Sequence, residues 1–375
     1  MMKTNRLDPL DALRAFAILM VFALHAAGRT GLPNTSSTFI FFLPAWAGVW
    51  ILFVLSGYLI GKGFKTKRYK NKIDFIKKRF VRICVPYYVF IFILLLLISP
   101  RLIVDDPGTL LRMITFTYDG TPGGSGRGIL WFVSTLMQFY IISVFFEILV
   151  RKIEKNEHAC TILFIVLLIS GLILRQLLYD MEYGWNKYVY TLSLTNLDVF
   201  FCGFLLSRMI KERPAEKKGP DTQHRHRQTV FALLSIAMLL SVVVFFSYCS
   251  LAGQTAVGYR TFYMYRGQTL TILATCFYIY CLDRSVRRHN EKLSLSAVKR
   301  NPFRIVECFA AVSLGFYFWH SIILIQTASV FQPHPTMGDH LITMAAAGIL
   351  TTAMAIIFYY SVEKWSVGML RRSES

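Results

Sequence analysis

The chain has 375 residues, of which 55% are hydrophobic and 17% are charged, and its formal net charge is +20. This composition is typical of a polytopic membrane protein, and it excludes an ordinary soluble globular domain. The seven cysteines have no paired spacing, so they predict neither a disulfide framework nor a zinc site, and we expect no metal.

Ten apolar stretches predict a single all-α membrane domain over residues 1–375. Most of them are long enough to cross a bilayer as helices, which satisfy their own backbone hydrogen bonds. Residues 101–127 include the glycine-rich run TPGGSGRG and predict an outer loop, with room for a re-entrant or surface helix. The approximate spans are 10–27, 39–61, 84–100, 128–150, 160–178, 188–210, 229–251, 263–282, 304–327 and 339–363.

Lys and Arg residues are concentrated in alternate loops. If both termini are cytoplasmic, the inner segments contain 32 of the 41 and the outer loops contain six. Cytoplasmic loops of membrane proteins carry such an excess, so the distribution supports ten spans with both termini inside. Membrane topology also accounts for the net charge without a nucleic-acid partner.

The first span, LDALRAFAILMVFALH, contains two ionisable side chains, Arg14 and His25. Ten residues lie between them, so His25 is eleven positions after Arg14. This spacing is about three helical turns, or ~16 Å of rise, and places them within roughly 20° of each other around the helix. Ionisable groups inside a span are costly and usually mark functional sites, so we expect both to face one interior channel. The alternative is that Arg14 snorkels to the headgroups and His25 only packs.

The inner loop 62–83 contains ten Lys or Arg residues and one acid, Asp74. One interpretation is an anchor on anionic lipid. Arg79 and Arg82 stand apart, because they lie three residues apart at the mouth of the third span, where they share a helix face. A pair of guanidinium groups can bind phosphate bidentately, so these two are candidate phosphate ligands on the cytoplasmic side.

Four short motifs are spread over the whole chain. They are LDALRA at 10–15 followed by His25, FVLSGYLI at 53–60, RFVRI at 79–83 followed by PYY at 86–88, and SLGFYFWH at 313–320 with VEK at 362–364. In this order they resemble the acyltransferase-3 family, membrane enzymes that move acetyl or other acyl groups from coenzyme A onto glycans, lipids and other acceptors. The corresponding family patterns are LDGLRA with an arginine-ten residues-histidine spacing, FFxLSGFLI, RxxRI-x-P-x-Y, and YxxH with a closing E-K/R.

One segment departs from the family pattern. Many glycan-modifying relatives carry W-S-L-x-V-E-E-Q-F-Y in the middle of the chain, whereas residues 130–140 read LWFVSTLMQFY. Trp131, Gln138, Phe139 and Tyr140 match, but both glutamates are absent, which indicates a different branch. Twelve residues follow residue 363, so we expect any transfer to finish at the membrane domain itself.

The resemblance implies an O-acyltransferase with acetyl-CoA, or another acyl-CoA, as its donor substrate. We expect the nucleotide end of the donor at Arg79, Arg82 and Arg14, and its thioester near His25 toward the outer side. His25 then acts as general base toward an acceptor hydroxyl, or as nucleophile through a covalent acyl-histidine. The expected acceptor is a cell-surface or exported carbohydrate, or a glycolipid, at a bacterial cytoplasmic membrane.

Four further residues are candidates for binding the two substrates. Trp131 and Tyr140 either line an acceptor cavity or serve as packing aromatics. Ser56 and Gly57 allow close approach of the donor, or of a neighbouring helix alone.

Three ionisable residues lie in later spans. His320, in the outer half of the ninth span, is expected to reach the chamber of His25. Glu363, at the inner end of the tenth, is expected to pair with a basic residue near the cytoplasmic surface. Asp198 in the sixth span is either functional or one half of a buried structural pair.

A proton-coupled transporter of a glycan precursor or small molecule is the alternative from another class. Ten spans with buried ionisable groups also describe such carriers. The two halves show no internal repeat of the kind that many transporters have, and the four motifs favour acyl transfer. Within the enzyme class, the acceptor can instead be a lipid, a peptidoglycan sugar or a small secreted molecule.

Overall fold

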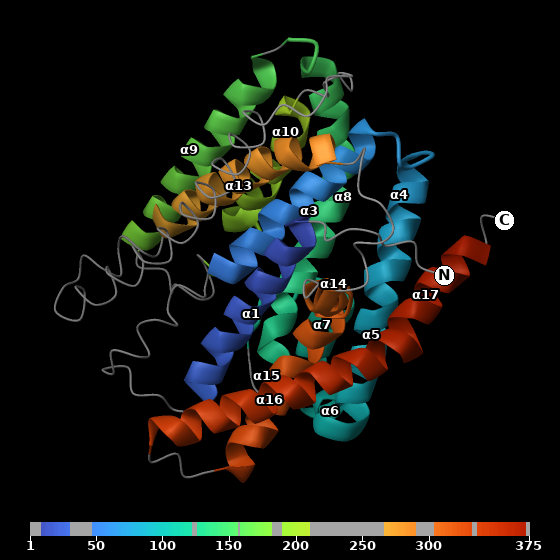
Figure 1. Ribbon diagram of the computed structural model, residues 1–375, viewed down its shortest axis with the longest axis vertical. Coiled ribbons are helices and arrows are strands. Elements are labelled where there is room, and N and C mark those ends of the chain that lie inside the picture. The colour runs from blue at the N-terminus through green and yellow to red at the C-terminus, as the bar shows by residue number, and fades with distance from the viewer. Residues whose placement is uncertain are drawn as a thin grey trace.

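The computed structural model describes residues 9–30, 47–121, 126–156, 158–181, 190–210, 266–289, 304–331 and 336–372. Every regular element within these ranges is a helix, which confirms the predicted all-α class (Figure 1). The predicted span 229–251 lies outside the described residues.

Six helical stretches among the described residues are long and apolar enough to cross a membrane. They coincide with six of the predicted spans, although residues 39–46 of the second lie outside the described part. The third is longer than predicted, because the helix already begins in the basic loop. The stretches are Leu10–Arg29, Ala47–Lys65, Lys72–Ile98, Arg127–Ile153, Ala159–Leu178 and Met337–Leu370.

Three other predicted spans are only partly matched by the described helices. Helix α10 (Leu197–Met209) covers the end of the sixth, and α13 (Gly267–His289) covers the eighth. The ninth is divided into α14 (Arg304–Ala311) and α15 (Ser313–Val330), because Val312 has φ −95° and ψ 6°, outside the helical region. The count of ten spans and the cytoplasmic position of both termini therefore stay predictions.

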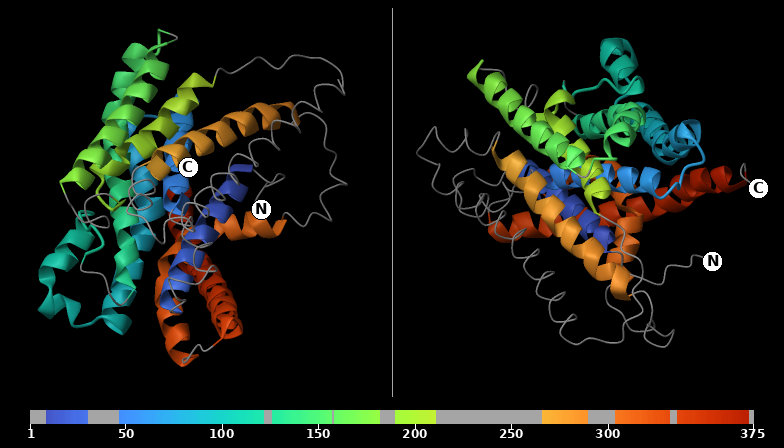
Figure 2. Two further views of the ribbon diagram at one scale, coloured as in Figure 1. Left: turned by 90° about the vertical axis from the view of Figure 1, so that its left-hand side faces the viewer. Right: turned by 90° about the horizontal axis from the view of Figure 1, so that it is seen from above.

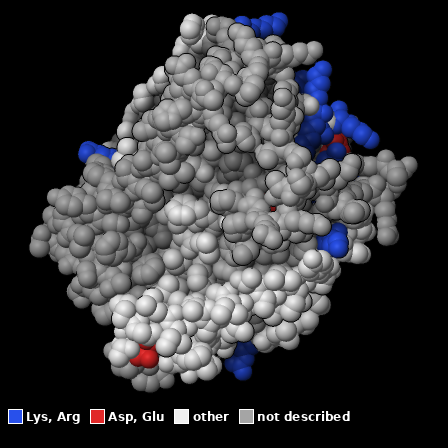
Figure 3. Space-filling model, viewed as in Figure 1, with Lys and Arg blue, Asp and Glu red and all other residues white. Residues whose placement is uncertain are grey.

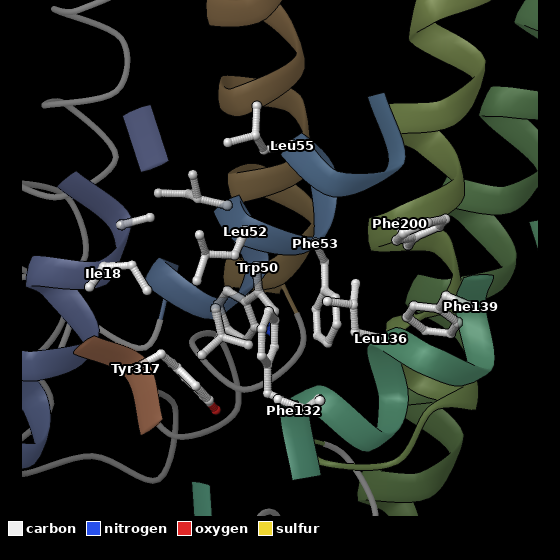
Figure 4. Close-up of a cluster of buried hydrophobic side chains, with 14 of the residues drawn as sticks. Ile18, Trp50, Leu52, Phe53, Leu55, Phe132, Leu136, Phe139, Phe200 and Tyr317 are labelled. Atoms are coloured by element: carbon white, nitrogen blue, oxygen red, sulfur yellow. The ribbon is translucent and has the colours of Figure 1, made fainter. Parts of the chain in front are cut away.

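Helix α3 (Ala47–Lys65) forms the centre of the bundle and packs against α1 (Pro9–Arg29), α8 (Trp131–Ile153), α10 and α13. Its Phe53 ring lies 4.7 Å from the Phe132 ring and 5.5 Å from the Phe139 ring of α8, between ring centroids (Figure 4). A helix that is apolar on every side is expected in such a buried position.

Helix α9 (Ala159–Asp180) lies at the edge of the bundle, and only 11% of its apolar span is buried (Figure 1). Large apolar side chains therefore face outward along its length, including Ile162, Ile169 and Leu177. Lipid tails provide the apolar surroundings that such a surface requires, which supports a position in a membrane.

The third span is one rod that changes helix type three times. It consists of α4 (Lys72–Arg79), the π-helix η2 (Phe80–Cys84), α5 (Val85–Ile93) and the π-helix η3 (Leu94–Ile98). Pro86 is the second residue after η2, and a proline lacks an amide hydrogen and clashes with the carbonyl four residues earlier, here that of Arg82. A widened π-turn relieves that clash, and such turns are frequent at functional sites.

The C-terminal rod also contains a π-turn. Helix α16 (Met337–Phe358) continues through η10 (Tyr359–Glu363) into α17 (Lys364–Arg372). Helix α16 packs against α15, while η10 and α17 lie beside α5 and η2 of the third span. The two widened turns, one carrying Arg82 and the other ending at Glu363, are therefore brought to the same region of the bundle.

The predicted helix in the loop 101–127 is confirmed as two short helices, α6 (Leu102–Asp105) and α7 (Pro107–Ile114). Figure 2 shows this pair beside the lower end of the bundle. The Tyr87 hydroxyl donates to the Met113 carbonyl at 3.0 Å, which ties α7 to α5. Lys and Arg side chains gather instead at the upper right of Figure 3, over α4. The basic loop and the short helices thus lie at opposite ends of the third span.

Candidate functional site

Arg79, at the end of α4, lies among three aromatic rings. Its guanidinium carbon is 5.5 Å from the ring centroid of Tyr140, 5.8 Å from that of Phe75 and 5.9 Å from that of Tyr69. Its Nη2 also donates to the Tyr69 hydroxyl at 2.6 Å. Cation–π contacts and this hydrogen bond hold the guanidinium in one orientation.

Arg82, three residues later on η2, has an exposed side chain. It interacts electrostatically with Arg79, with Arg14 of α1 and with Arg68 of the preceding loop. The structure therefore brings together the three arginines that the sequence predicted, although Arg14 is far from the other two in the chain. We call these four residues, with Tyr69 and Tyr140, the arginine cluster.

The arginine cluster has an excess of positive charge. Asp11 pairs with Arg14 at 2.6 Å, one turn earlier on the same helix. Within the part of the chain that the structure describes, no carboxylate forms an ion pair with Arg68, Arg79 or Arg82. Guanidinium groups without an internal carboxylate partner are suited to an external anion such as phosphate.

Glu363, at the end of η10, is the buried acid near the arginine cluster. Glu363 is 8% exposed, lies against Gly315 of α15 and interacts electrostatically with Arg82. The basic residue expected near it is therefore Arg82, although the two form no ion pair. One of its oxygens, Oε1, is buried without a hydrogen-bond partner.

His25 and His320 lie close together, as the sequence predicted for His320 of the ninth span. The ring of His25 on α1 and that of His320 on α15 have centroids 5.2 Å apart and planes inclined at 46°. His320 is 1% exposed, and its Nδ1 lies 2.6 Å from the Tyr317 carbonyl oxygen. Its Nε2 is buried, and no described residue forms a hydrogen bond with it. We call these two residues the histidine pair.

Helix α1 links the two groups, because it carries Arg14 in the arginine cluster and His25 in the histidine pair. The eleven-residue step from Arg14 to His25 corresponds to ~16 Å along the helix axis. A positively charged end and a pair of titratable rings deeper in the bundle are thus aligned along one helix. Such an arrangement can bind an anion at one end and carry out proton transfer at the other.

Trp131 and Tyr140 do not lie together. Trp131, at the start of α8, is 7% exposed and packs against Tyr190 at 5.0 Å and Phe53 at 6.2 Å between ring centroids. Tyr140 lies nine residues further along the helix and belongs to the arginine cluster. Of the two predicted acceptor ligands, Tyr140 is therefore placed with the candidate phosphate ligands.

Gly57 lies where α3 crosses α10, and Ser56 beside it is half-buried. A Cβ atom at Gly57 would overlap the backbone carbonyl oxygen of Phe200, and one at Gly203 of α10 would overlap that of Val54. The neighbours of Gly57 are those expected for close helix packing, the second of the two alternatives.

Asp198 is one half of a buried ion pair. Arg175 of α9 donates Nη1 and Nη2 to its two carboxylate oxygens, each at 2.9 Å, and both side chains are at most 2% exposed. Arg175 also donates to the Thr195 carbonyl at 2.9 Å and to the Thr269 hydroxyl at 3.0 Å. These bonds connect α9, α10 and α13, which supports the structural alternative.

The motifs and the charge pattern did not single out Arg68 or Tyr69, and they included Tyr317 only as the tyrosine of the YxxH motif. Arg68 and Tyr69 lie in the basic loop, where an anchor on lipid explains them equally well. The signal that identifies Tyr69 is its aromatic ring beside a candidate phosphate ligand, but only the folded loop places it there. Tyr317 holds His320 through a backbone carbonyl, which every residue type possesses.

An open cavity of about 420 Å³ lies beside α6. Hydrogen bonds from the Thr109 hydroxyl and backbone N–H hold the pKa of Asp106 below its usual range, so this carboxylate is charged at neutral pH. Among the described residues, no group of three His, Cys, Asp or Glu side chains is arranged to hold a metal. The cavity is lined by Ile98, Ser99, Pro100, Arg101, Leu102, Asp105, Asp106 and Arg127.

Comparisons with known proteins agree with the four motifs. The pattern of the acyltransferase-3 family, described as an acyltransferase domain, matches residues 8–360. The chain is also 23% identical over 377 aligned positions to a protein of Bacillus subtilis (strain 168) named "Putative peptidoglycan O-acetyltransferase YrhL".

The alignment covers 95% of this chain and 54% of the relative, so the chain spans about half the length of that protein. No solved structure matches the chain. Because the family pattern extends over nearly the whole sequence and the bundle contains helices that can span a membrane, the chain belongs to the acyltransferase-3 family of membrane acyltransferases.

Proposed function

We propose that this protein is an O-acyltransferase of a bacterial cytoplasmic membrane that moves an acetyl group from acetyl-CoA to a hydroxyl of a cell-surface or exported carbohydrate. The observation that carries the proposal is the alignment of the arginine cluster and the histidine pair along α1. The relative named for peptidoglycan O-acetylation supports the acetyl group and the carbohydrate acceptor.

The donor binds with its phosphates at the arginine cluster. Arg79 is oriented by Tyr69 and Tyr140, while the exposed Arg82 is accessible to an anion from the cytoplasm. A planar guanidinium can donate two parallel hydrogen bonds to a phosphate, which a lysine ammonium cannot. The thin pantetheine arm then extends into the bundle, so that the nucleotide itself need not cross the membrane.

The acetyl group is transferred at His25. As the acceptor oxygen attacks the thioester carbonyl, His25 removes the hydroxyl proton, and the carbon–sulfur bond breaks to release the thiolate. The imidazolium returns its proton to that sulfur, so the products are an acetyl ester and free coenzyme A. In the second route, the imidazole first takes the acetyl group from the thioester, and the thiolate leaves. The acetyl-imidazole then passes the acetyl group to the hydroxyl, whose proton goes to the thiolate.

The acceptor approaches from the side of α6 and α7, which is the outer side in the proposed topology. The cavity beside α6 contains carboxylates and guanidinium groups, which can hydrogen-bond to the hydroxyls of a sugar. The 3-10 helix η4 (Arg127–Leu130), which contributes Arg127 to that cavity, packs against α15. The short helix η4 thus lines the cavity and also contacts α15, the helix that carries His320.

Transfer of label from acetyl-CoA, labelled in its acetyl group, tests this function. Membranes containing the wild-type chain, His25→Ala or His158→Ala are incubated with the donor, and carbohydrate and lipid fractions are counted separately. His158 is an exposed histidine in the loop before α9, so its variant controls for loss of an imidazole. We expect His25→Ala to lower carbohydrate labelling by roughly 10²–10⁴-fold, the usual contribution of general acid–base catalysis, and His158→Ala to leave it unchanged.

The distribution of label decides between the alternatives. His25-dependent label in the lipid fraction would replace the carbohydrate acceptor with a lipid. The absence of His25-dependent label, in membranes that contain folded protein and acceptor, would contradict acetyl transfer and favour another acyl donor or the transporter.

A further inference from the structure

The hydrogen bonding of His320 determines which of its nitrogens carries the proton. A backbone carbonyl can only accept, so the 2.6 Å contact with Tyr317 requires a hydrogen on Nδ1. The ring is 1% exposed, and a neutral imidazole has one N–H. Its Nε2 is therefore a bare acceptor, buried and without a hydrogen-bond partner among the residues that the structure describes.

His25 is the titratable residue that faces His320. Ring centroids 5.2 Å apart place the two imidazoles in contact, so rotation of the His25 ring can bring one of its nitrogens to hydrogen-bond distance from His320. Catalytic hydrogen bonds often become short only when the substrate is bound. Among the described residues the charged group that acts on His25 is Arg29 at the end of α1, so no carboxylate takes the orienting role.

We propose that His320 is the positioning residue of the reaction and that its Nε2 accepts the N–H of His25. The second ring nitrogen of His25 is then bare and directed to the acceptor hydroxyl. This inference rests on the proposed function. It gives His320 the role of orienting His25, not of binding the acceptor.

The surroundings of His320 support such a role, because its ring is held from two sides. The Tyr317 hydroxyl donates to the Ile129 carbonyl of η4, which fixes this turn of α15 against a second element. The Phe316 ring lies nearly parallel to the imidazole, with planes inclined at 4° and centroids 6.4 Å apart. When His25 takes a proton, its bond to Nε2 becomes charge-assisted and therefore stronger, which stabilises the imidazolium.

Two amide variants separate the nitrogens of His320. His320→Gln can place a carbonyl oxygen near the position of Nε2 and so keeps an acceptor for His25. His320→Asn can keep a donor to the Tyr317 carbonyl but has no acceptor at the position of Nε2. We expect His320→Asn to lower kcat by about 100-fold, within the range for a proton-transfer partner, and His320→Gln to lie within about tenfold of the wild type. The KM for acetyl-CoA and for the acceptor is expected to stay unchanged in both.

The measured pattern either supports or overturns the inference. Equal losses of kcat in the two variants, with folded protein shown by thermal unfolding, would mean that His320 serves packing alone. A rise in the KM for the acceptor would place His320 on the acceptor itself. If wild-type membranes transfer no more acetyl label than His25→Ala membranes, the proposed function itself is contradicted. The two failures are therefore distinguishable. If His320→Asn does not fold, His320→Gln compared with His320→Leu gives the same contrast.

Discussion

Arg79 and Arg82 lie three residues apart on one helical rod, yet their surroundings differ. Arg79 is held by three aromatic rings and the Tyr69 hydroxyl, whereas the Arg82 side chain is exposed. The Arg79 guanidinium, and with it the positive charge, is therefore held in one position. Arg82 is free to move toward a ligand and remains close to the buried Glu363.

Arg82→Gln is expected to weaken donor binding more than catalysis. Hydrogen bonds to a charged group contribute about 1.5–3 kcal/mol, so the KM for acetyl-CoA should rise roughly 10–100-fold with little change in kcat. Lys77→Gln, at an exposed position of α4, is the matched control and should have no effect. Steady-state kinetics over a range of donor concentrations measures both constants. An equal effect of the two variants would mean that only the overall charge of the loop matters.

Glu363→Gln tests the role of the buried acid. Before the donor binds, the carboxylate attracts the Arg82 guanidinium. The phosphates of the donor must then compete with the carboxylate for Arg82. A neutral amide of the same size removes this competition, so we expect the KM for acetyl-CoA to fall by about threefold to tenfold, equivalent to ~0.6–1.4 kcal/mol. The same kinetic measurement on Glu154→Gln, an acid bonded to Arg208, provides the comparison. A higher KM in Glu363→Gln would show that the acid instead holds Arg82 in its binding position.

Close crossing of α3 and α10 organises the bundle at the level of elements. Gly57 on α3 and Gly203 on α10 each face backbone atoms of the other helix, with no space for a Cβ. Small residues at such positions let the backbones approach, which strengthens helix association in membranes. The crossing positions α3 between α1 and α8, the helices that carry Arg14, His25 and Tyr140.

Gly57→Ala is expected to destabilise the protein by about 1–3 kcal/mol, since an added methyl group in a tight contact forces the helices apart. Gly28→Ala is the control, because a Cβ at Gly28 meets no atom within 4 Å. Thermal unfolding of the purified protein in detergent measures the difference. A Gly57→Ala protein as stable as Gly28→Ala would show that the helices shift at little cost.

At the scale of the whole molecule, the arrangement has two chemically different ends. The basic loop with the arginine cluster lies at one end of the third span, and α6, α7 and the polar cavity lie at the other (Figures 1 and 3). The buried ion pair of Arg175 and Asp198 connects α9, α10 and α13 and belongs to neither of these two ends. Donor and acceptor can thus enter from opposite sides if the rod crosses the membrane in the predicted direction.

The predicted direction can be measured with single cysteines in a background without other cysteines. Gly108 on α7 and Lys77 on α4 are both exposed, so a cysteine at either position is accessible. We expect a membrane-impermeant maleimide to label Gly108→Cys in intact cells, and Lys77→Cys only after the membrane is opened, because the excess of Lys and Arg predicts that the basic loop is cytoplasmic. The reverse pattern would place the arginine cluster outside, away from cytoplasmic acetyl-CoA.

The sequence by itself determined the helical class, six helices long and apolar enough to span a membrane, and the expected shared face of Arg14 and His25. These features depend on hydropathy and on the 3.6-residue period, which are local properties of the chain. It also pointed to Arg79, Arg82 and His320 through motifs; the structure places them in the arginine cluster and the histidine pair, and their roles stay predictions.

Only the tertiary structure decided which distant residues meet. Helix crossing brought Arg14 of α1 to Arg82, selected Arg175 as the partner of Asp198, and separated Trp131 from the arginine cluster that Tyr140 joined. The pairing of side chains far apart in the chain depends on how helix surfaces fit together, and hydropathy carries no information on that fit. For the same reason the bare Nε2 of His320 was visible only once the turn of α15 had placed Nδ1 on a carbonyl.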